Sequence, residues 1–204
     1  IDAQGYVWVF STSHGTSRPS YIHKSSKPYD IDAFELVEAT IDAGDGIVPL
    51  TNFSYWQVWP HKEGGFEVYF TKYNNPVART LFYTTSTDGM HWTNHSRIAA
   101  FGVGHYQISA RGNGRTGSAF NYHPDRRVDG LPGLNLRTNL YYVETADRGE
   151  RWTNAAGEPL SLPLVDVGNP ALVADYESDS LLVYLKDIAY DVDDNPVILY
   201  ITSH

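Results

Sequence analysis

Short runs of alternating or aromatic-rich residues recur along the chain, separated by Gly-bearing or acidic turns. Four of these runs share one pattern, in which a short apolar and aromatic stretch closes on a hydroxyl residue: SYIHKS, LFYTTS, LYYVET and ILYITS. Their closing residues are Ser25, Ser86, Thr145 and Ser203, so the intervals are 61, 59 and 58 residues. Such runs predict β-strands, and helical periodicity is nowhere convincing. The pattern predicts an all-β chain in which one strand unit recurs four times.

Each of these runs follows a second candidate strand, and three of those follow a third. The second strands are GYVWVFS, GFEVYFTK, TGSAFNY and SLLVYLK, and the first strands are YWQVWPH, HYQISAR and PALVADY. The stretches DAQG, KEGG, GNG and ESDS are typical of hairpin turns between first and second strands. A unit of four short antiparallel strands that repeats in this way predicts the blade of a β-propeller.

The phase of the repeats predicts where the blades begin and end. We expect one domain, a partial β-propeller over residues 1–204, with approximate blades at 1–47, 48–101, 102–163 and 164–204. The first blade lacks its first strand and the last blade lacks its last strand. Propellers typically close with about 4–8 blades, so some three and a half blades predict an incomplete ring and a fragment of a longer protein.

Two turns in this framework carry the same side chains at almost the same spacing. STDGMHW and TADRGERW each combine a hydroxyl residue, an Asp, a Gly and a closing Trp. The hydroxyl and the Asp can accept hydrogen bonds from turn amides, Gly supplies a positive φ, and Trp can fold back onto the blade. These turns resemble the Asp-box, or BNR motif, of sialidase-like propellers. A third copy, SSKPYDIDAF, is degenerate because it lacks Gly and ends in Phe34.

A wider resemblance covers nearly the whole chain. GYVWVFSTSHGTSRPSYIHKSSKPYDIDAFE, FNYHPDRR, RTNLYYVETADRGERW and DDNPVILYITS are similar to BNR repeat-containing proteins of the BNR-4 type, which neighbour propeller-type ulvan lyases. The resemblance implies a carbohydrate-active propeller that cleaves an acidic polysaccharide by β-elimination, with His and Tyr in proton transfer and Arg neutralising the uronate.

Charge is spread unevenly over the 204 residues. The net charge of -9 argues against nucleic-acid partners, but residues 101–138 hold five basic and two acidic residues. This basic segment favours an anionic small molecule or glycan as the partner. The chain has no Cys, no apolar stretch long enough to span a membrane and no visible leader. With a polysaccharide as partner, we expect a secreted or periplasmic protein.

Propeller geometry places the loops after the second strands, together with the connections between blades, on the face that usually binds ligands. β-Elimination needs a cation for the carboxylate, a base for the neighbouring carbon-bound proton and an acid for the leaving oxygen. We assign proton transfer to His123 or His105 together with Tyr122, and carboxylate neutralisation to Arg137. Further side chains on or near this face are candidates for substrate binding: His14, Arg18, Gln57, Tyr73, Asn74, Arg79 and Arg126.

Two positions hold residues that a lyase site would not need. Asn74 follows GFEVYFTKY where a His would be useful, and Gln57 stands where a base would be useful. Asn and Gln bind sugars but do not transfer protons, so a non-catalytic glycan-binding propeller is an alternative. A sialidase-like glycoside hydrolase is another, although the Phe/Tyr-Arg-Ile-Pro motif is absent.

We expect no required cofactor. A calcium site in DVDDN lacks the spaced ligands of an EF-hand, so an exposed acidic turn is the simpler interpretation. A zinc site would require His14, His105 and His123 to converge.

Overall fold

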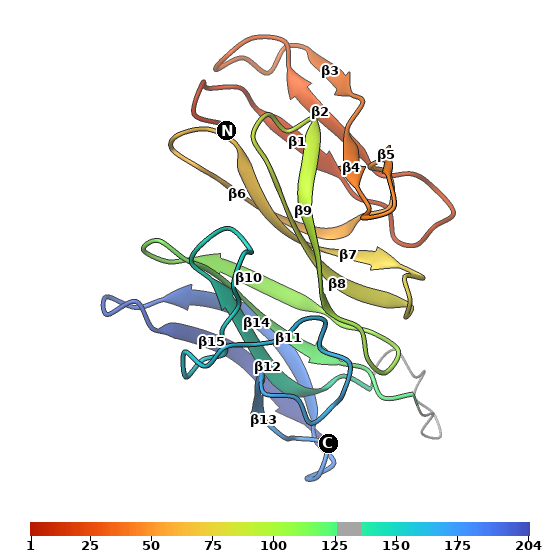
Figure 1. Ribbon diagram of the computed structural model, residues 1–204, viewed down its shortest axis with the longest axis vertical. Coiled ribbons are helices and arrows are strands. Elements are labelled where there is room, and N and C mark those ends of the chain that lie inside the picture. The colour runs from red at the N-terminus through yellow and green to blue at the C-terminus, as the bar shows by residue number, and fades with distance from the viewer. Residues whose placement is uncertain (126–135) are drawn as a thin grey trace. The chain divides into compact units, whose positions relative to one another are not determined.

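The computed structural model describes residues 1–125 and 136–204, and these residues contain strands but no helix (Figure 1). Accordingly, no helix that could cross a membrane is found in this part of the chain. The contacts divide the chain into two compact units. Unit 1 comprises Ile1–Tyr73 and Phe82–Ser96, and unit 2 comprises Asn74–Leu81 and Arg97–His204. The all-β prediction is confirmed for the described residues.

The first sheet lies in unit 1 and has three antiparallel strands in the order β1-β2-β3. Their bounds are Trp8–Ser11, Tyr21–Ser25 and Phe34–Val37. Trp8 pairs with Lys24, and Ile22 pairs with Val37. β1 and β2 coincide with the two strands expected from GYVWVFS and SYIHKS.

The second sheet has six strands in the order β5-β4-β9-β8-β7-β6. The bounds are β4 Thr40–Asp42, β5 Ile47–Pro49, β6 Ser54–Pro60, β7 Phe66–Tyr73, β8 Arg79–Ser86 and β9 His91–Ala99. β6 and β7 form the hairpin predicted around KEGG. β4 pairs with β9 in parallel, with Thr40 opposite His91. We expected residues 40–47 in the first repeat, but their strand joins the sheet of the second, because the outer edge of β9 is open to pairing.

The third sheet lies in unit 2 and has the order β10-β11-β12-β13. The bounds are β10 Gln107–Arg111, β11 Thr116–Tyr122, β12 Thr138–Thr145 and β13 Leu172–Ala174. PALVADY was expected to be a first strand, and this was wrong: Leu140 of β12 pairs with Ala174. At the other end of β12, Thr153 bridges Glu144, so two separate segments share the outer edge of this strand. β14 (Leu182–Tyr190) and β15 (Pro196–Ser203) form a separate hairpin.

The turn between β8 and β9 makes the hydrogen bonds expected from its side chains. Ser86 Oγ accepts one from the Gly89 amide (2.8 Å), and Asp88 Oδ1 accepts from the amides of Met90 and His91 (2.8 Å each). Burial raises the pKa of Asp88, but the hydrogen bonds from His91 and its neighbours outweigh that effect and lower the pKa to about 2. Trp92 Nε1 donates to Gly89 O (3.0 Å), which folds the indole back onto the turn.

The turn after β12 repeats this arrangement. Thr145 Oγ1 accepts from the Gly149 amide (2.9 Å), and Asp147 Oδ1 accepts from the Arg151 amide (2.8 Å). Trp152 Nε1 donates to Gly149 O (3.1 Å). The two glycines have φ values of +76° and +91°, a region that other residues rarely adopt. The same local chemistry therefore builds both turns, as their sequences predict.

Each unit has its own apolar cluster. In unit 1, Trp92 and Phe70 are fully buried among aliphatic and aromatic side chains of β2, β4 and β7. In unit 2, Tyr142 and Ile188 pack with small side chains of β10 and β11. Every residue of β7, β8 and β12 is buried, so the side chains of these strands are covered on both faces of the sheet.

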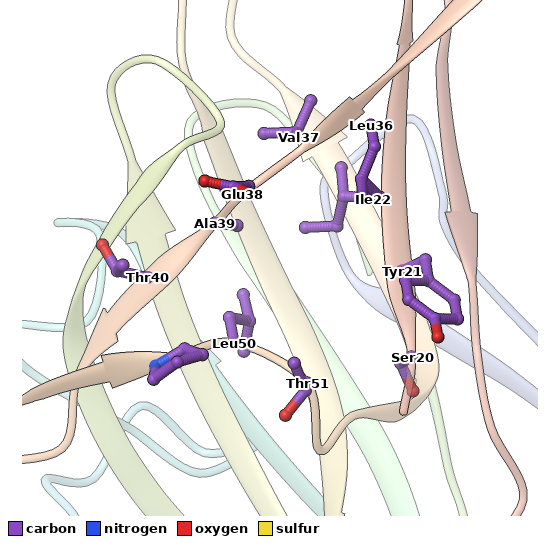
Figure 2. A pocket seen from close by; sticks show the side chains of 11 residues that line it. Ser20, Tyr21, Ile22, Leu36, Val37, Glu38, Ala39, Thr40, Leu50 and Thr51 are labelled. Atoms are coloured by element: carbon purple, nitrogen blue, oxygen red, sulfur yellow. The ribbon is translucent and has the colours of Figure 1, made fainter. Parts of the chain in front are cut away.

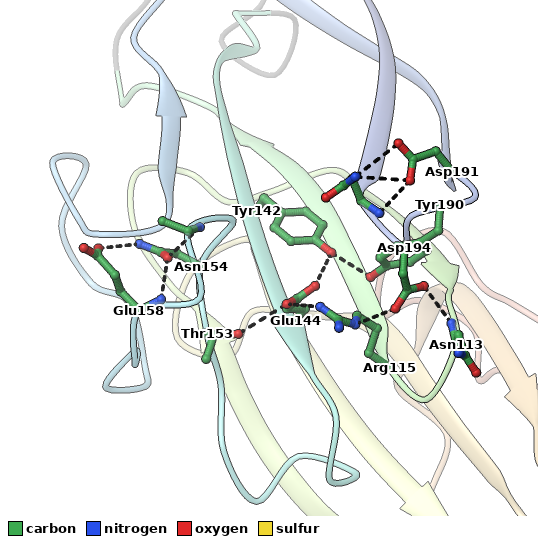
Figure 3. A network of polar contacts seen from close by, with 12 residues as sticks. Asn113, Arg115, Tyr142, Glu144, Thr153, Asn154, Glu158, Tyr190, Asp191 and Asp194 are labelled. Atoms are coloured by element: carbon green, nitrogen blue, oxygen red, sulfur yellow. Dashed lines mark hydrogen bonds and ion pairs between the residues drawn. The ribbon is translucent and has the colours of Figure 1, made fainter.

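A polar network ties the β14–β15 turn to the third sheet (Figure 3). Glu144, which is 9% exposed, accepts hydrogen bonds from Tyr142 Oη (2.8 Å) and Arg115 Nη1 (3.1 Å). Arg115 Nε also lies 2.9 Å from Asp194 Oδ2, and the hydroxyls of Tyr142 and Tyr190 are 2.6 Å apart. The buried carboxylate is thus satisfied by a side chain of its own strand, β12, and by one from the turn between β10 and β11.

Candidate functional site

Two glycines between β9 and β10 bring the parts of the site together. Gly104 has a φ of +133°, and a Cβ atom at this position would lie 2.5 Å from the carbonyl oxygen of Arg79. This close approach allows the His105 amide to donate to Arg79 O (2.9 Å). The His123 amide donates to Gly104 O (3.0 Å), and His123 O lies next to Gly102. Segments far apart in sequence are therefore joined by their backbones.

Five side chains of unit 2 form what we call the Tyr106 cluster: Arg79, Tyr106, His123, Arg137 and Tyr184. The ring centroids of Tyr106 and His123 are 4.9 Å apart. The guanidinium carbons of Arg79 and Arg137 lie 4.9 and 4.1 Å from the Tyr106 ring centroid. Arg137 also lies 5.3 Å from the ring of Tyr184. All three are cation–π distances, so the cluster holds two positive charges against one phenol ring.

His123 is the most unusual member of the cluster. Its ring is 0% exposed, and neither ring nitrogen has a hydrogen-bond partner among residues 1–125 and 136–204. Burial, followed by the charges of Arg79, Arg137 and His105, lowers the pKa of His123 to about 3. The imidazole is therefore neutral at neutral pH, with one nitrogen able to accept a proton.

Arg137 lies just before β12 and is half-buried. Its Nε atom is buried without a hydrogen-bond partner, and no carboxylate of the described residues pairs with its guanidinium. A guanidinium that is partly removed from water without a counter-charge favours the binding of an anion. The position suits the neutralisation of a uronate carboxylate, which is the role that we expected for Arg137.

His105 is held differently from His123. The Phe101 amide donates to His105 Nε2 (3.3 Å), and His105 Nδ1 lies 3.1 Å from the carbonyl oxygen of Asn121. Nδ1 therefore carries the proton, and both nitrogens are engaged. Burial, opposed by the Asn121 hydrogen bond, lowers the pKa of His105 to about 3. This geometry favours a structural role for His105 over the proton transfer that we expected.

Tyr122 does not join His123. Its hydroxyl donates to a carboxylate oxygen of Glu177, and its ring packs against Phe101 (5.6 Å) and Tyr141 (6.3 Å). Consecutive residues at the end of a strand point to opposite faces, which explains why neighbours in sequence lie in different environments. The Glu177 amide is fixed in turn by Asn139 Oδ1 (2.8 Å). The tyrosine beside His123 is Tyr106 instead.

Three of the expected substrate-binding residues lie close together in unit 1. The ring of His14 is 5.8 Å from that of Tyr73 and 6.2 Å from that of Tyr55. His14 and Arg18 line one pocket of about 510 Å³. Gln57 is half-buried in β6 and pairs with Tyr69 of β7.

The remaining expected residues have different surroundings. Asn74 is exposed after β7 and has a φ of +56°. Arg79 is 4% exposed and belongs to the Tyr106 cluster. Arg126 lies outside the described residues.

Tyr106 and Tyr184 belong to the cluster but were not predicted as site residues. Tyr106 follows His105 directly, and the alternation of HYQISAR places the two side chains on opposite faces. This alternation was a signal that one of the pair faces the site. Tyr184 carried no comparable signal, because its place depends on where β14 packs.

A second pocket in unit 1, of about 380 Å³, has a different character. Side chains of β2, β3 and the segment around β4 and β5 line it (Figure 2). Most are apolar, including Ile22, Leu36 and Leu50. Such a lining offers few hydrogen-bond donors for a sugar, so the charged Tyr106 cluster is the better candidate for glycan chemistry.

Within the two described ranges, no three His, Asp or Glu side chains are grouped so that they could hold a metal ion. Asp191, in DVDDN, accepts hydrogen bonds from the amides of Asp193 and Asn195 (2.9 Å each), so it stabilises its own turn.

Comparisons with known proteins agree with this architecture. Two solved structures of ulvan lyase PL25 match with TM-scores of 0.77 and 0.78, each at 18% identity, and one of them is bound to a -[GlcA(1-4)Rha3S]- ligand. Each match covers 98% of this chain and 49% of the other, so the chain spans about half the length of those lyases. At this identity the likeness shows a shared fold, that of propeller-type lyases. No curated protein matches the chain.

The family is shown by the sequence itself. The model of the BNR repeat-containing family, BNR_4, matches residues 1–204, which is the whole chain. The chain therefore belongs to the BNR repeat-containing family.

Proposed function

We propose that the chain is part of a carbohydrate-active protein that cleaves an acidic polysaccharide by β-elimination at the Tyr106 cluster. The observation that carries this proposal is the guanidinium of Arg137, which pairs with no carboxylate of the described residues and lies beside the neutral ring of His123. A cation for the carboxylate and a base for the adjacent proton are the two groups that elimination needs first. The fold shared with ulvan lyases supports the same class of reaction.

In the proposed reaction, the uronate carboxylate binds Arg137, which makes the proton on the adjacent carbon more acidic. His123 accepts that proton, and the electron pair of the broken C–H bond forms a C=C bond. The C–O bond to the leaving sugar breaks, and the leaving oxygen takes a proton from the hydroxyl of Tyr106. The bound carboxylate also offsets the charges of Arg79 and Arg137, so substrate binding raises the pKa of His123 and makes it a stronger base.

The burial of His123 means that substrate access requires movement of the protein. Because the ring is 0% exposed, substrate reaches it only when covering side chains move on binding. Catalytic contacts commonly form only in the substrate complex. The reaction uses protein side chains alone, and we propose no cofactor. A polymeric substrate further favours a secreted or periplasmic protein.

Two other functions have specific observations in their favour. Gln57 and Asn74 stand where bases were expected, which favours a glycan-binding protein without catalysis. The hydrogen bond between Tyr122 and Glu177 resembles the pairing that a Tyr nucleophile needs in sialidase-type hydrolysis. Tyr122 is only 3% exposed, however, so the Tyr106 cluster remains the better site.

One assay separates the three functions. The protein is incubated with uronate-containing polymers, and both ultraviolet absorbance of the unsaturated product and new reducing ends are followed. A lyase produces both signals, a hydrolase produces reducing ends alone, and a binding protein is retained on a glycan gel without producing either. Arg137→Ala and His123→Ala should each lower the elimination rate by about a hundredfold or more. Arg148→Ala, which removes an exposed arginine from the same unit, should leave the rate unchanged; equal rates for all three variants would contradict the proposal.

A further inference from the structure

The outer edge of β3, in unit 1, is open. β3 has a single neighbour in its sheet, which is β2. The Ser26 amide donates to Ala33 O (3.0 Å), and along an antiparallel pair the backbone groups point alternately toward the partner strand and away from it. The amide and carbonyl groups of Phe34 and Leu36 therefore point away from β2, and they form no hydrogen bond with any residue of the described ranges, 1–125 and 136–204. Such an edge can pair with a further strand.

The side chains along this edge are apolar and exposed. Phe34 and Leu36 are 38% and 55% exposed. The apolar pocket of about 380 Å³ lies at the end of β3, where Leu36 lines it together with Ile22 of β2 and Leu50, which follows β5 (Figure 2). Exposed apolar side chains next to an apolar pocket are typical of a surface that binds another protein.

The surroundings of the edge are acidic. Residues 28–50 contain six Asp or Glu residues and no Lys or Arg. Glu35 and Glu38 are exposed, and neither forms an ion pair with any described residue. Lys24, which pairs with Glu35 across the sheet, instead has its Nζ atom 3.9 Å from the ring centroid of Tyr6. The charge favours a cationic partner, and it disfavours a second copy of this chain because two paired β3 strands would bring like charges together.

We propose that the open edge of β3 binds an extended basic segment of another protein, which adds to the β1-β2-β3 sheet as a further strand. The backbone of this segment pairs with the free amide and carbonyl groups of Phe34 and Leu36. One of its apolar side chains enters the pocket beside Leu36, and Lys or Arg residues at alternate positions lie near Glu35 and Glu38. Strand addition derives its affinity from backbone hydrogen bonds and its specificity from the side-chain sites along the edge. This surface lies in unit 1 and is independent of the proposed elimination chemistry.

The test uses fluorescently labelled peptides of about six residues, the length of a typical strand, in which Val alternates with Lys. Anisotropy should show that this peptide binds about tenfold more tightly than one in which Val alternates with Glu. Amide hydrogen exchange, followed by NMR, should slow at Phe34 and Leu36 when the basic peptide binds. N-methylation of alternate peptide nitrogens blocks one edge of the peptide, so one of the two complementary methylated peptides should lose binding and the other should keep it.

Variants of the protein separate the charges from the backbone. Glu35→Gln combined with Glu38→Gln should weaken binding of the basic peptide about fivefold, as expected for two exposed ion pairs. Glu150→Gln combined with Glu158→Gln removes the same charge from exposed positions of unit 2 and should bind like the wild type. Leu36→Pro removes an amide donor from an edge strand, where proline is tolerated, and should weaken binding about tenfold. The methylated peptides test the same hydrogen bonds without a change in the protein.

Equal affinity for the basic and acidic peptides would overturn the proposal, and so would unchanged hydrogen exchange at Phe34 and Leu36 with the peptide bound. Equal effects of the two methylation patterns would show that no strand is added. Sedimentation of the protein alone tests the other occupant. If the protein formed a dimer in which these two amides were protected without peptide, the edge would bind a second copy of the chain and the proposal would be wrong.

Discussion

Replacing Gly104 with alanine tests how the site is assembled. The φ of +133° costs a non-Gly residue about 1–3 kcal/mol. The added Cβ would lie 2.5 Å from Arg79 O and 2.7 Å from Arg79 N, so one backbone must move, at about 1–3 kcal/mol more. Together these terms predict a loss of about 4 kcal/mol, or a fall in Tm of about 8–16 °C for a chain of this size.

Two other glycines provide matched controls. Gly114 has a φ of +80° but nothing within 4 Å of an added Cβ, so Gly114→Ala should cost only the conformational part, about 1–3 kcal/mol. Gly168 has neither a left-handed φ nor a neighbour within 4 Å, so Gly168→Ala should change stability by about 0.5 kcal/mol or less.

The assay is thermal and urea unfolding of the three variants, followed by oligouronate binding well below their melting temperatures. Gly104→Ala should also weaken binding, because it displaces Arg79 and His123, whereas Gly114→Ala should not. If Gly104→Ala were no less stable than Gly114→Ala, the close approach to Arg79 would be unimportant and our account of the site would fail.

The remaining predictions concern buried charge. In the folded protein, the pKa values of His105 and His123 are lowered to about 3. As the pH falls below about 6.5, both imidazoles therefore become protonated in the unfolded state but stay neutral in the folded state. Urea unfolding should therefore show stability that is complete above that pH and falls toward pH 3, by up to about 2.7 kcal/mol per pH unit for two groups; a flat profile would contradict the burial of these rings. Glu144→Gln should cost about 1.5–3 kcal/mol in urea unfolding, because Tyr142 and Arg115 lose a charged acceptor. Glu158→Gln, an exposed carboxylate whose contact with Asn154 an amide oxygen can replace, should cost about 0.5 kcal/mol or less, and equal losses would refute the role of the network.

The features that sequence predicts well here are local ones. The turns at Ser86 and Thr145 follow from side chains that bond amides two to four residues away, so their geometry is contained in seven or eight residues. The strands around them follow from alternation and aromatic content. The parallel pairing of β4 with β9 could not be predicted in this way, because it joins Thr40 to His91 across a long intervening segment.

In the candidate site, too, sequence predicts the local features but not the long-range contacts. His123 and Arg137, which the structure brings together around Tyr106, were candidates because both lie in the basic segment of residues 101–138. Tyr122 was expected beside His123 because the two are consecutive, but the pleat of the strand sends them to opposite faces. Tyr106 enters the site only because Gly104 lets its backbone approach Arg79, a contact between residues 25 positions apart. Side-chain direction and backbone pairing at this distance are set by tertiary structure.

The central claim is that Arg137 receives the carboxylate of a uronate at the Tyr106 cluster. A crystal structure of the protein with an unsulfated oligouronate tests it most directly. We predict a carboxylate within about 3 Å of the Arg137 guanidinium, with the adjacent sugar carbon facing His123. An oligouronate bound elsewhere, with Arg137 still stacked on Tyr106 and free of any carboxylate, would contradict it.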